Sequence, residues 1–361
     1  RILTAKDQGL FTGVCLLDMS KAFDKVQHVK LLQDLHSVGV SGSALDWFAS
    51  YLSGHTQRVC LGSRTSSKSV CTSGVLQGSV LGPILFSLYT REVPAVVGQS
   101  ESVQFADDIA LACSRRTAQE VSDVLSASVS ILADWLKDRG LILNAGKSQV
   151  VPIPAGRQHT ADLQVVCHAT SLPSVLSARY LGATIDSGMS WHAHIAKCSA
   201  RVSQKIGALW RMRRCLNHQS RMTYFRSLIM SDLLYASNAY SSSLQRRYLD
   251  RLQVLQNSGA RAVFGRPPWS SARDLLERIA VFRVAEVFNQ KLAYLVWRCR
   301  YALASPELQA LLTPAAPGPT RLQSAVGLCV PVSRSVAGRG RFACKGAVLW
   351  NALPSDIRAI H

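Results

Sequence analysis

Apolar residues form two different patterns along the first half of the chain, continuous short runs and a helical spacing. Short apolar runs end abruptly in polar residues, as in "TGVCLLDMS" (12–20), which predicts a buried strand that stops at Asp18. Apolar residues at every third position between Val26 and Leu35 predict a helix within 25–40. By the same patterns, further helices are predicted over 43–54, 79–93 and 117–140, a strand pair over 57–62 and 68–75, and a short strand over 178–186.

The second half has a helical and strongly basic pattern. Beyond Asp186, amphipathic helices are predicted over 194–216, 221–240 and 246–265. Residues 201–300 hold 18 Lys and Arg against 5 Asp and Glu, and the whole chain carries a net charge of +19. Such an excess favours a polyanionic partner, first nucleic acid and second an acidic membrane surface. The apolar runs are too short or too charged to span a bilayer, so no membrane-spanning segment is expected, and nucleic acid rather than a membrane is the expected partner.

These patterns predict an α+β fold with a change of character near residue 186. An antiparallel sheet with packed helices occupies 1–186, basic helices occupy 187–312, and 313–361 holds a Pro-rich linker, "TPAAPGPT", followed by a basic segment. The ten cysteines form no CxxC pair, which argues against a zinc ribbon or a redox motif. Apolar neighbours of Cys15 and Cys113 indicate reduced thiols, as in an intracellular protein.

Two adjacent aspartates interrupt the apolar stretch "SVQFADDIALAC" (102–113), which predicts a hairpin with Asp107 and Asp108 at its tip. If the strand that ends at Asp18 lies beside this hairpin, three carboxylates converge at one edge of a sheet. Carboxylates this close repel one another unless a cation lies between them, and Mg²⁺ prefers such hard oxygen ligands. Two ions roughly 4 Å apart activate a hydroxyl and stabilise leaving pyrophosphate. The alternative is an ordinary solvated turn.

Five sequence blocks in a fixed order carry a family resemblance. They are "LLDMSKAFDKV" (16–26), "SGVLQGSVLGPILFSLY" (73–89), "QFADDIAL" (104–111), "WLKDRGLILNAGKSQVV" (135–151) and "YLGATID" (180–186). Together they resemble the palm motifs of reverse transcriptases from non-LTR (LINE-type) retrotransposons. The resemblance implies a polymerase palm with partial fingers over 1–186 and a helical thumb and connection over 187–312. The tail "FACKGAVLWNALPSDIR" resembles the carboxyl end of the second reading frame of such elements.

The resemblance implies roles for the acids and for one lysine. Asp18 and Asp107 match the catalytic, metal-binding aspartates, and Asp108 matches the third acid of the site. Lys147 matches the lysine proposed to protonate the leaving pyrophosphate, a general-acid role. The implied cofactor is a pair of Mg²⁺ ions held by the three aspartates, with Mn²⁺ as the alternative.

The remaining matches concern the nucleotide and the primer. Phe23 falls at the steric-gate position, where a bulky ring excludes a ribose 2′-hydroxyl and so favours deoxynucleotides. Gln77 and Gly78 match the loop that contacts the incoming nucleotide and the template, although Leu76 stands where the family usually has proline. Without that proline the loop is less restricted, and we expect weaker nucleotide positioning. The primer-gripping hairpin is matched by Tyr180, Leu181 and Gly182.

The implied function is RNA-directed DNA polymerisation. Its partners would be an RNA template, a DNA primer and deoxynucleotide triphosphates, with priming at a nicked chromosome implied by the resemblance alone. The chain starts with Arg1, close before Asp18. The family's upstream fingers strands and endonuclease are therefore expected on a longer parent polyprotein. The expected location is a cytoplasmic ribonucleoprotein and the nucleus.

Three other interpretations remain open at the level of the sequence. A degenerate or repurposed copy would bind nucleic acid through its basic helices without catalysis. An RNA-making polymerase is disfavoured by the bulky Phe23. In "WHAHIAKC" (191–198), His194 and Cys198 lie on one helical face and could share a metal, whereas His192 points elsewhere.

Overall fold

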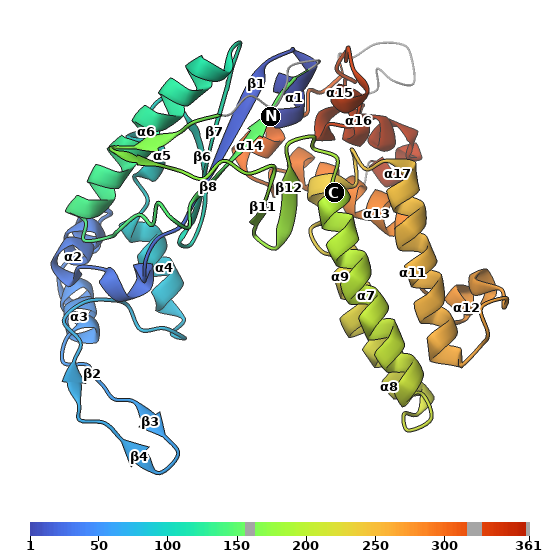
Figure 1. Cartoon of the computed structure of the whole chain (residues 1–361), viewed down its shortest axis with the longest axis horizontal. Helices are drawn as coiled ribbons and strands as arrows, with labels where there is room; N and C mark the ends of the chain where they lie inside the picture. Colours follow the sequence, from blue (N-terminus) through green and yellow to red (C-terminus); the bar gives the residue numbers. More distant parts are fainter. Residues whose placement is uncertain (156–162, 316–326, 359–361) are drawn as a thin grey trace. The chain divides into compact units, whose positions relative to one another are not determined.

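The computed structural model describes residues 1–155, 163–315 and 327–358 (Figure 1). The chain divides into two compact units. The sheet unit is Leu10–Leu181, and the helical unit is Arg1–Gly9 together with Gly182–His361. The predicted Pro-rich linker lies outside the described residues from position 316 onward.

A four-stranded antiparallel sheet forms the centre of the sheet unit. Its strand order is β6 (Glu101–Phe105), β7 (Asp108–Arg115), β1 (Phe11–Leu17) and β8 (Gln149–Ile153). All seven residues of β1 are buried, as expected for an apolar run between two hydrogen-bonded neighbours. The predicted strand ending before Asp18 and the predicted hairpin over 102–113 are both confirmed.

One long helix covers the two central strands. This helix, α6 (Ala118–Asp138), packs on β1 and β7. It begins with the predicted capping box, in which Thr117 Oγ1 accepts from the Glu120 N–H and the Glu120 carboxylate accepts from the Thr117 N–H. The close approach of α6 to the sheet depends on Gly13 in β1, because a Cβ there would lie 2.6 Å from Leu125 Cδ1. The absence of a side chain at Gly13 therefore sets how closely α6 approaches the sheet.

Shorter helices complete the sheet unit, and three of them match the predicted segments. These are α2 (His28–Ser37), α3 (Ser43–Leu52) and α4 (Leu81–Tyr89), with the 3₁₀ turn η1 (Ala22–Lys25) before them and α5 (Val93–Val96) after them. The small strand pair β9 (Val166–Cys167) and β10 (Thr170–Ser171) follows β8. The predicted strand over 178–186 is wrong in one respect, because Leu181 and Gly182 have φ of 45° and 79° and separate β11 (Ser177–Tyr180) from β12 (Ala183–Asp186).

The predicted strand pair between α3 and α4 forms a two-stranded arm. Thr56–Gln57 (β2) pairs with Ser69–Val70 (β5), and Cys60–Leu61 (β3) pairs with Arg64–Thr65 (β4). Figure 1 shows the arm extending beyond the end of α3. All residues of these four strands are exposed, so backbone pairing rather than a core holds the arm together.

The helical unit is built around α7 (His192–Met212), α11 (Arg246–Phe264) and α13 (Val284–Arg300). The single helix predicted over 221–240 is wrong. It is divided into α8 (His218–Tyr224), the π-helical η2 (Phe225–Met230), α9 (Ser231–Leu234) and α10 (Ser237–Tyr240). Ala236 has φ of 52°, which no α-helix accommodates and which apolar periodicity does not reveal. The remaining helices of the unit are α1 (Ile2–Asp7), α12 (Ala272–Arg278), α14 (Pro306–Gln309), α15 (Val336–Arg339), α16 (Phe342–Ala352) and α17 (Ser355–Arg358).

Within the helical unit, the start of the chain contacts the predicted carboxyl-terminal segment. The Asp7 carboxylate accepts hydrogen bonds from the backbone N–H groups of Arg334 and Ser335 and from the Ser335 hydroxyl. These bonds lower the pKa of Asp7, the Ser335 hydroxyl most of all. Residues 1–9 and the segment after residue 327 therefore stabilise each other.

The mixed helix and antiparallel-sheet class is confirmed. The compact units differ from the predicted sequence domains in two ways: the division falls after Leu181, and Arg1–Gly9 belongs with the helical unit. The functional names given to 1–186, 187–312 and 313–361 stay predictions. Across the described ranges, no helix combines the length and the apolar character needed to cross a membrane.

Gly13 gives a direct test of how α6 packs on the sheet. Gly13→Ala should lower the free energy of unfolding by about 1–3 kcal/mol, because the new methyl group overlaps Leu125, Val121 and Leu163. Urea denaturation followed by circular dichroism measures the change. Gly146→Ala is the control, since its nearest neighbour lies 3.7 Å away and the change should stay within about 0.5 kcal/mol. Equal stabilities for the two variants would contradict the packing described.

Candidate active site

Three aspartates gather at one edge of the four-stranded sheet. Leu17, the last residue of β1, pairs with Ile109 of the antiparallel strand β7. Asp18 follows Leu17 and Asp108 precedes Ile109, so the two aspartates lie next to each other on neighbouring strands. Asp107 lies beside them in the two-residue turn that joins β6 to β7. The predicted neighbourhood of the two acidic segments is therefore present in the sheet.

The backbone on both sides holds these residues in place. Asp18 donates its N–H to Ser148 Oγ at 3.1 Å, and its carbonyl accepts from the Asn144 N–H at 2.8 Å. Ala106, which precedes Asp107 in the turn, has φ of 53°. An L-residue in that region costs roughly 1 kcal/mol, and such strained positions are common at functional sites. The turn thus keeps Asp107 at the sheet edge at an energetic cost.

The pKa of Asp108 is raised by burial and by repulsion from the neighbouring acids. Burial raises the pKa of its carboxyl group, and the negative charges of Asp107 and Asp18 raise it further. Across the ranges that the structure describes, neither Asp18, Asp107 nor Asp108 forms an ion pair with a basic side chain. The site is therefore a local concentration of negative charge within a strongly basic protein.

A small hollow of about 110 Å³, which we call the acid hollow, lies at this edge. It brings together Asp18, Asp108, Lys147 and Tyr180 from the sequence prediction, while Asp107 lies outside its lining. Burial and the Asp108 charge raise the pKa of the Tyr180 phenol, and its hydroxyl donates to the Val103 carbonyl at 3.5 Å. The full lining is Leu16, Leu17, Asp18, Asp108, Ile109, Lys147, Gln149, Arg179 and Tyr180.

Arg179 is the residue of the acid hollow that the sequence analysis missed. It precedes Tyr180 at the end of β11 and lines the hollow together with Lys147. In the sequence, Arg179 directly precedes the primer-grip match "YLG", and this position is the signal that could have pointed to it. The hollow therefore combines two acids and two bases, as expected where phosphate groups and cations are bound together.

The donor chemistry of the aspartates fits Mg²⁺. Within the described residues no three His, Cys, Asp or Glu side chains are arranged to hold a metal by themselves. Mg²⁺ takes one or two carboxylates and completes its shell with water and substrate phosphates. Asp18 and Asp108 lie at adjacent strand ends, and among the described side chains neither forms an ion pair. The two residues therefore supply the one or two carboxylates that Mg²⁺ needs from the protein.

The predicted nucleotide-binding residues lie around the η1 turn. The Phe23 ring is half-buried and stacks on Phe86, with ring centroids 4.5 Å apart. Gln77 donates from Nε2 to Asp24 Oδ1 at 2.9 Å, which ties the loop of Gln77 to η1. Gly78 has φ of 83°, and no atom lies within 4 Å of the point that a Cβ would occupy there. The glycine thus leaves open space beside the loop.

The predicted primer residues span the division between the two units. Tyr180 ends β11 in the acid hollow, Leu181 is exposed, and Gly182 begins the helical unit. The positive φ values of Leu181 and Gly182 produce the turn that separates β11 from β12. Of the three residues, Tyr180 is the one that the structure brings to the aspartates.

His194 and Cys198, the alternative metal ligands considered from the sequence, are both buried in the helical unit. His194 is buried, and its Nδ1 accepts from the Thr184 N–H at 3.3 Å. Burial lowers the pKa of His194, with Arg201 and Lys197 lowering it further, while burial raises the pKa of the Cys198 thiol to about 11. A neutral histidine and a protonated thiol are typical of a packed interior. We therefore assign His194 and Cys198 to the core of the helical unit.

Comparison with known proteins defines the family. Residues 3–185 match the family model described as "Reverse transcriptase (RNA-dependent DNA polymerase)". The chain belongs to the reverse transcriptase family. This confirms the resemblance drawn from the sequence blocks.

Relatives among known proteins come from retrotransposons. The chain is 27% identical over 283 residues to the RNA-directed DNA polymerase from mobile element jockey of Drosophila funebris, covering 76% of this chain and 30% of that protein. It is 25% identical over 297 residues to the probable RNA-directed DNA polymerase from transposon X-element of Drosophila melanogaster, covering 80% and 32%. This reverse transcriptase chain thus spans about a third of the length of these relatives.

A solved telomerase structure from Candida tropicalis covers 84% of this chain and 51% of the telomerase chain, with 12% identity and a TM-score of 0.39. That score is too low for the likeness to add to the family assignment. The assignment to the reverse transcriptases therefore depends on the family match and the sequence relatives.

The raised pKa of Asp108 predicts a pH-dependent stability. A carboxyl group whose pKa is raised on folding contributes stability below its ordinary pKa of about 4, and this contribution is lost as the pH rises through the folded value. Asp108→Asn should therefore raise the melting temperature at neutral pH and leave it nearly unchanged below pH 4. Thermal denaturation at both pH values measures this. Asp123→Asn, at an exposed site on α6, should give no gain at neutral pH; an equal gain would contradict the explanation.

Proposed function

We propose that this chain is the polymerising part of a LINE-type reverse transcriptase and copies RNA into DNA. Family membership supports the reaction class. The observation that carries the proposal is the unpaired acidic edge, where Asp18 and Asp108 stand at adjacent strand ends with Asp107 in the turn beside them. In this proposal the sheet unit is the palm with part of the fingers, and the helical unit provides the thumb, the connection and the carboxyl-terminal basic segment.

The proposed reaction is nucleotidyl transfer. The oxygen of the primer 3′-hydroxyl gives up its proton to water and forms a bond to the α-phosphorus of a deoxynucleotide, while the bond from that phosphorus to the leaving pyrophosphate breaks. Two Mg²⁺ ions, or Mn²⁺ in their place, would be held by Asp18, Asp107 and Asp108. When bound, they neutralise the phosphates and lower the pKa of the attacking hydroxyl. Lys147 is exposed at the acid hollow and donates a proton to the pyrophosphate as it leaves.

The other residues position the two substrates. Tyr180, Leu181 and Gly182 hold the primer end, and Gln77 and Gly78 contact the incoming nucleotide and the template. The basic helices of the helical unit bind the phosphate backbone of the template–primer duplex, which makes affinity depend on salt. Priming at a nicked chromosome, and a location in cytoplasmic ribonucleoprotein and the nucleus, are parts of the same proposal.

A second candidate function is nucleic-acid binding without catalysis. One observation favours it: Leu76 replaces the usual proline of the nucleotide loop. In that case the helical unit would bind nucleic acid in a salt-dependent way, and no DNA would be made.

Primer extension on an RNA template separates the two candidates. The wild-type chain should extend a DNA primer with deoxynucleotides when Mg²⁺ is present, and Asp107→Asn should reduce the rate by about 100-fold or more because a charge that stabilises the reacting groups is lost. Asp123→Asn, an exposed aspartate elsewhere in the sheet unit, should extend normally. Salt-sensitive nucleic-acid binding without synthesis by the wild type would support the binding function instead.

Phe23 gives an independent test through sugar selectivity. Phe23→Val removes the bulk of the proposed steric gate and should raise the ratio of ribonucleotide to deoxynucleotide incorporation by about ten-fold or more. Deoxynucleotide incorporation by the same variant is the internal control, because loss of the stacking on Phe86 would lower both rates together. An unchanged ratio with normal deoxynucleotide incorporation would exclude Phe23 as the gate.

A further inference from the structure

A row of aromatic side chains runs along α3 toward a second hollow of the sheet unit. The Trp47 and Tyr51 rings are stacked, with centroids 5.4 Å apart and planes inclined by 10°. Tyr51 in turn meets His55 edge-on at 6.2 Å. Four-residue spacing places Trp47 and Tyr51 on one face of α3, and His55 follows the end of that helix. Trp47 is 54% exposed, so the outer end of this aromatic row is open to solvent rather than part of the core.

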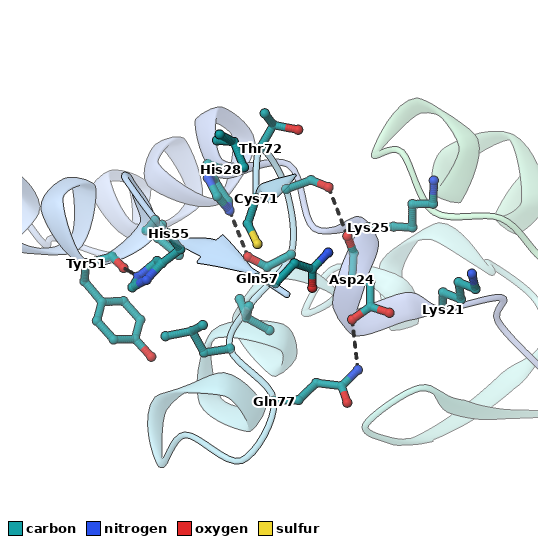
Figure 2. A pocket seen from close by; sticks show the side chains of 16 residues that line it. Lys21, Asp24, Lys25, His28, Tyr51, His55, Gln57, Cys71, Thr72 and Gln77 are labelled. Atoms are coloured by element: carbon teal, nitrogen blue, oxygen red, sulfur yellow. Dashed lines mark hydrogen bonds between the residues drawn. The ribbon is translucent and has the colours of Figure 1, made fainter. Parts of the chain in front are cut away.

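The hollow, which we call the arm pocket, has a volume of about 610 Å³. It lies between α3, the base of the arm and the η1 turn, and Figure 2 shows Tyr51 and His55 on one side and Lys21 and Lys25 on the other. Tyr51 and His55 belong both to the aromatic row and to the pocket lining. The two features therefore form one continuous surface.

Polar groups of the pocket are arranged to receive hydrogen bonds. His28 Nε2 lies 2.8 Å from the Gly74 carbonyl oxygen, and His55 Nε2 lies 2.6 Å from that of Tyr51. Because a carbonyl oxygen only accepts, Nε2 is the donor in both contacts, and in the neutral form of each ring Nδ1 is an acceptor. Such acceptors suit the hydroxyl and N–H donors of nucleotides.

The charge around the pocket is positive. Lys21 and Lys25 are exposed, and across the described ranges neither forms an ion pair. Asp24 is the acid of the lining, and it already accepts a hydrogen bond from Gln77. The sequence contains no Asp or Glu between Asp46 and Glu92, while the arm adds Arg58, Arg64 and Lys68. A polyanion therefore meets little repulsion along this surface.

We propose that the aromatic row and the arm pocket bind single-stranded nucleic acid. Bases stack on Trp47 and Tyr51, and phosphates lie near Lys21, Lys25 and the basic residues of the arm. Stacked aromatics beside a basic groove are the usual means of holding unpaired strands. The identity of the strand as unpaired template rests on the proposed function. A protein partner fits less well, because exposed lysines and arginines are interspersed with the exposed apolar residues Val59, Leu61 and Val70.

Binding of a short fluorescein-labelled oligouridylate to the full chain, followed by fluorescence anisotropy, tests the site. Trp47→Ala should weaken binding by about 5-fold or more because one base loses its stacking partner, and the dependence on salt should not change. Lys25→Gln should instead lower the slope of log affinity against log salt by about 0.7. Unchanged affinity and slope in both variants would overturn the proposal.

Matched variants separate a lost contact from a damaged fold. Trp47→Phe keeps an aromatic ring and should retain most of the affinity. Lys137→Gln, on the exposed face of α6, should leave both the affinity and the salt slope unchanged. A loss of affinity in both controls would overturn the assignment to this surface.

Photocrosslinking locates the bound strand directly. An oligonucleotide carrying a photoreactive iodouracil base should crosslink to Trp47 or Tyr51, identified by mass spectrometry. Crosslinks confined to residues 182–358 would overturn the proposal. If the wild-type chain crosslinks at Trp47 or Tyr51 but makes no DNA, the polymerase proposal fails and this site does not, so the two failures are distinguishable.

Discussion

The register between β1 and β7 is the constraint on which the candidate active site depends. Leu17 pairs with Ile109, and this places Asp18 and Asp108 at the same edge on neighbouring strands. The register is fixed by burial, because Leu17 and Ile109 both lie in the core of the sheet unit, and a slip of one residue would reverse every side chain. Apolar packing therefore positions the charged groups.

That position has an energetic cost. Asp107 and Asp18 repel Asp108, whose pKa is raised, and the turn before Asp107 contains Ala106 in a left-handed conformation. Both features lower the free energy of unfolding. Both lie at the sheet edge where phosphoryl transfer would need several carboxylates close together to hold cations. A site that favoured stability alone would pair these acids with basic side chains, whereas Lys147 and Arg179 line the same hollow and, within the described residues, form no ion pair with them. Lys and Arg outnumber Asp and Glu over residues 201–300, and the segment between Asp46 and Glu92 contains no acidic residue, so the positive charge that attracts a polyanion lies apart in the sequence from the small acidic edge.

The sequence by itself determined the local elements and the candidate residues. A continuous apolar run identified β1, two aspartates within an apolar stretch identified the hairpin, and helical periodicity identified α6 with its Thr117–Glu120 capping box, because burial and capping are read from neighbouring residues. The ordered blocks around Asp18 and Asp107 also indicated the family, which the family match over 3–185 bears out.

Tertiary structure decided what depends on residues distant in the sequence. The predicted helix over 221–240 is interrupted at Ala236, and the strand over 178–186 turns at Leu181 and Gly182, because single left-handed residues leave the apolar pattern unchanged. Arg179 enters the acid hollow, and Asp7 bonds to Ser335, through contacts that no local pattern encodes. Register and long-range hydrogen bonds form only when the core has brought the segments together, and they fix which charges face each other.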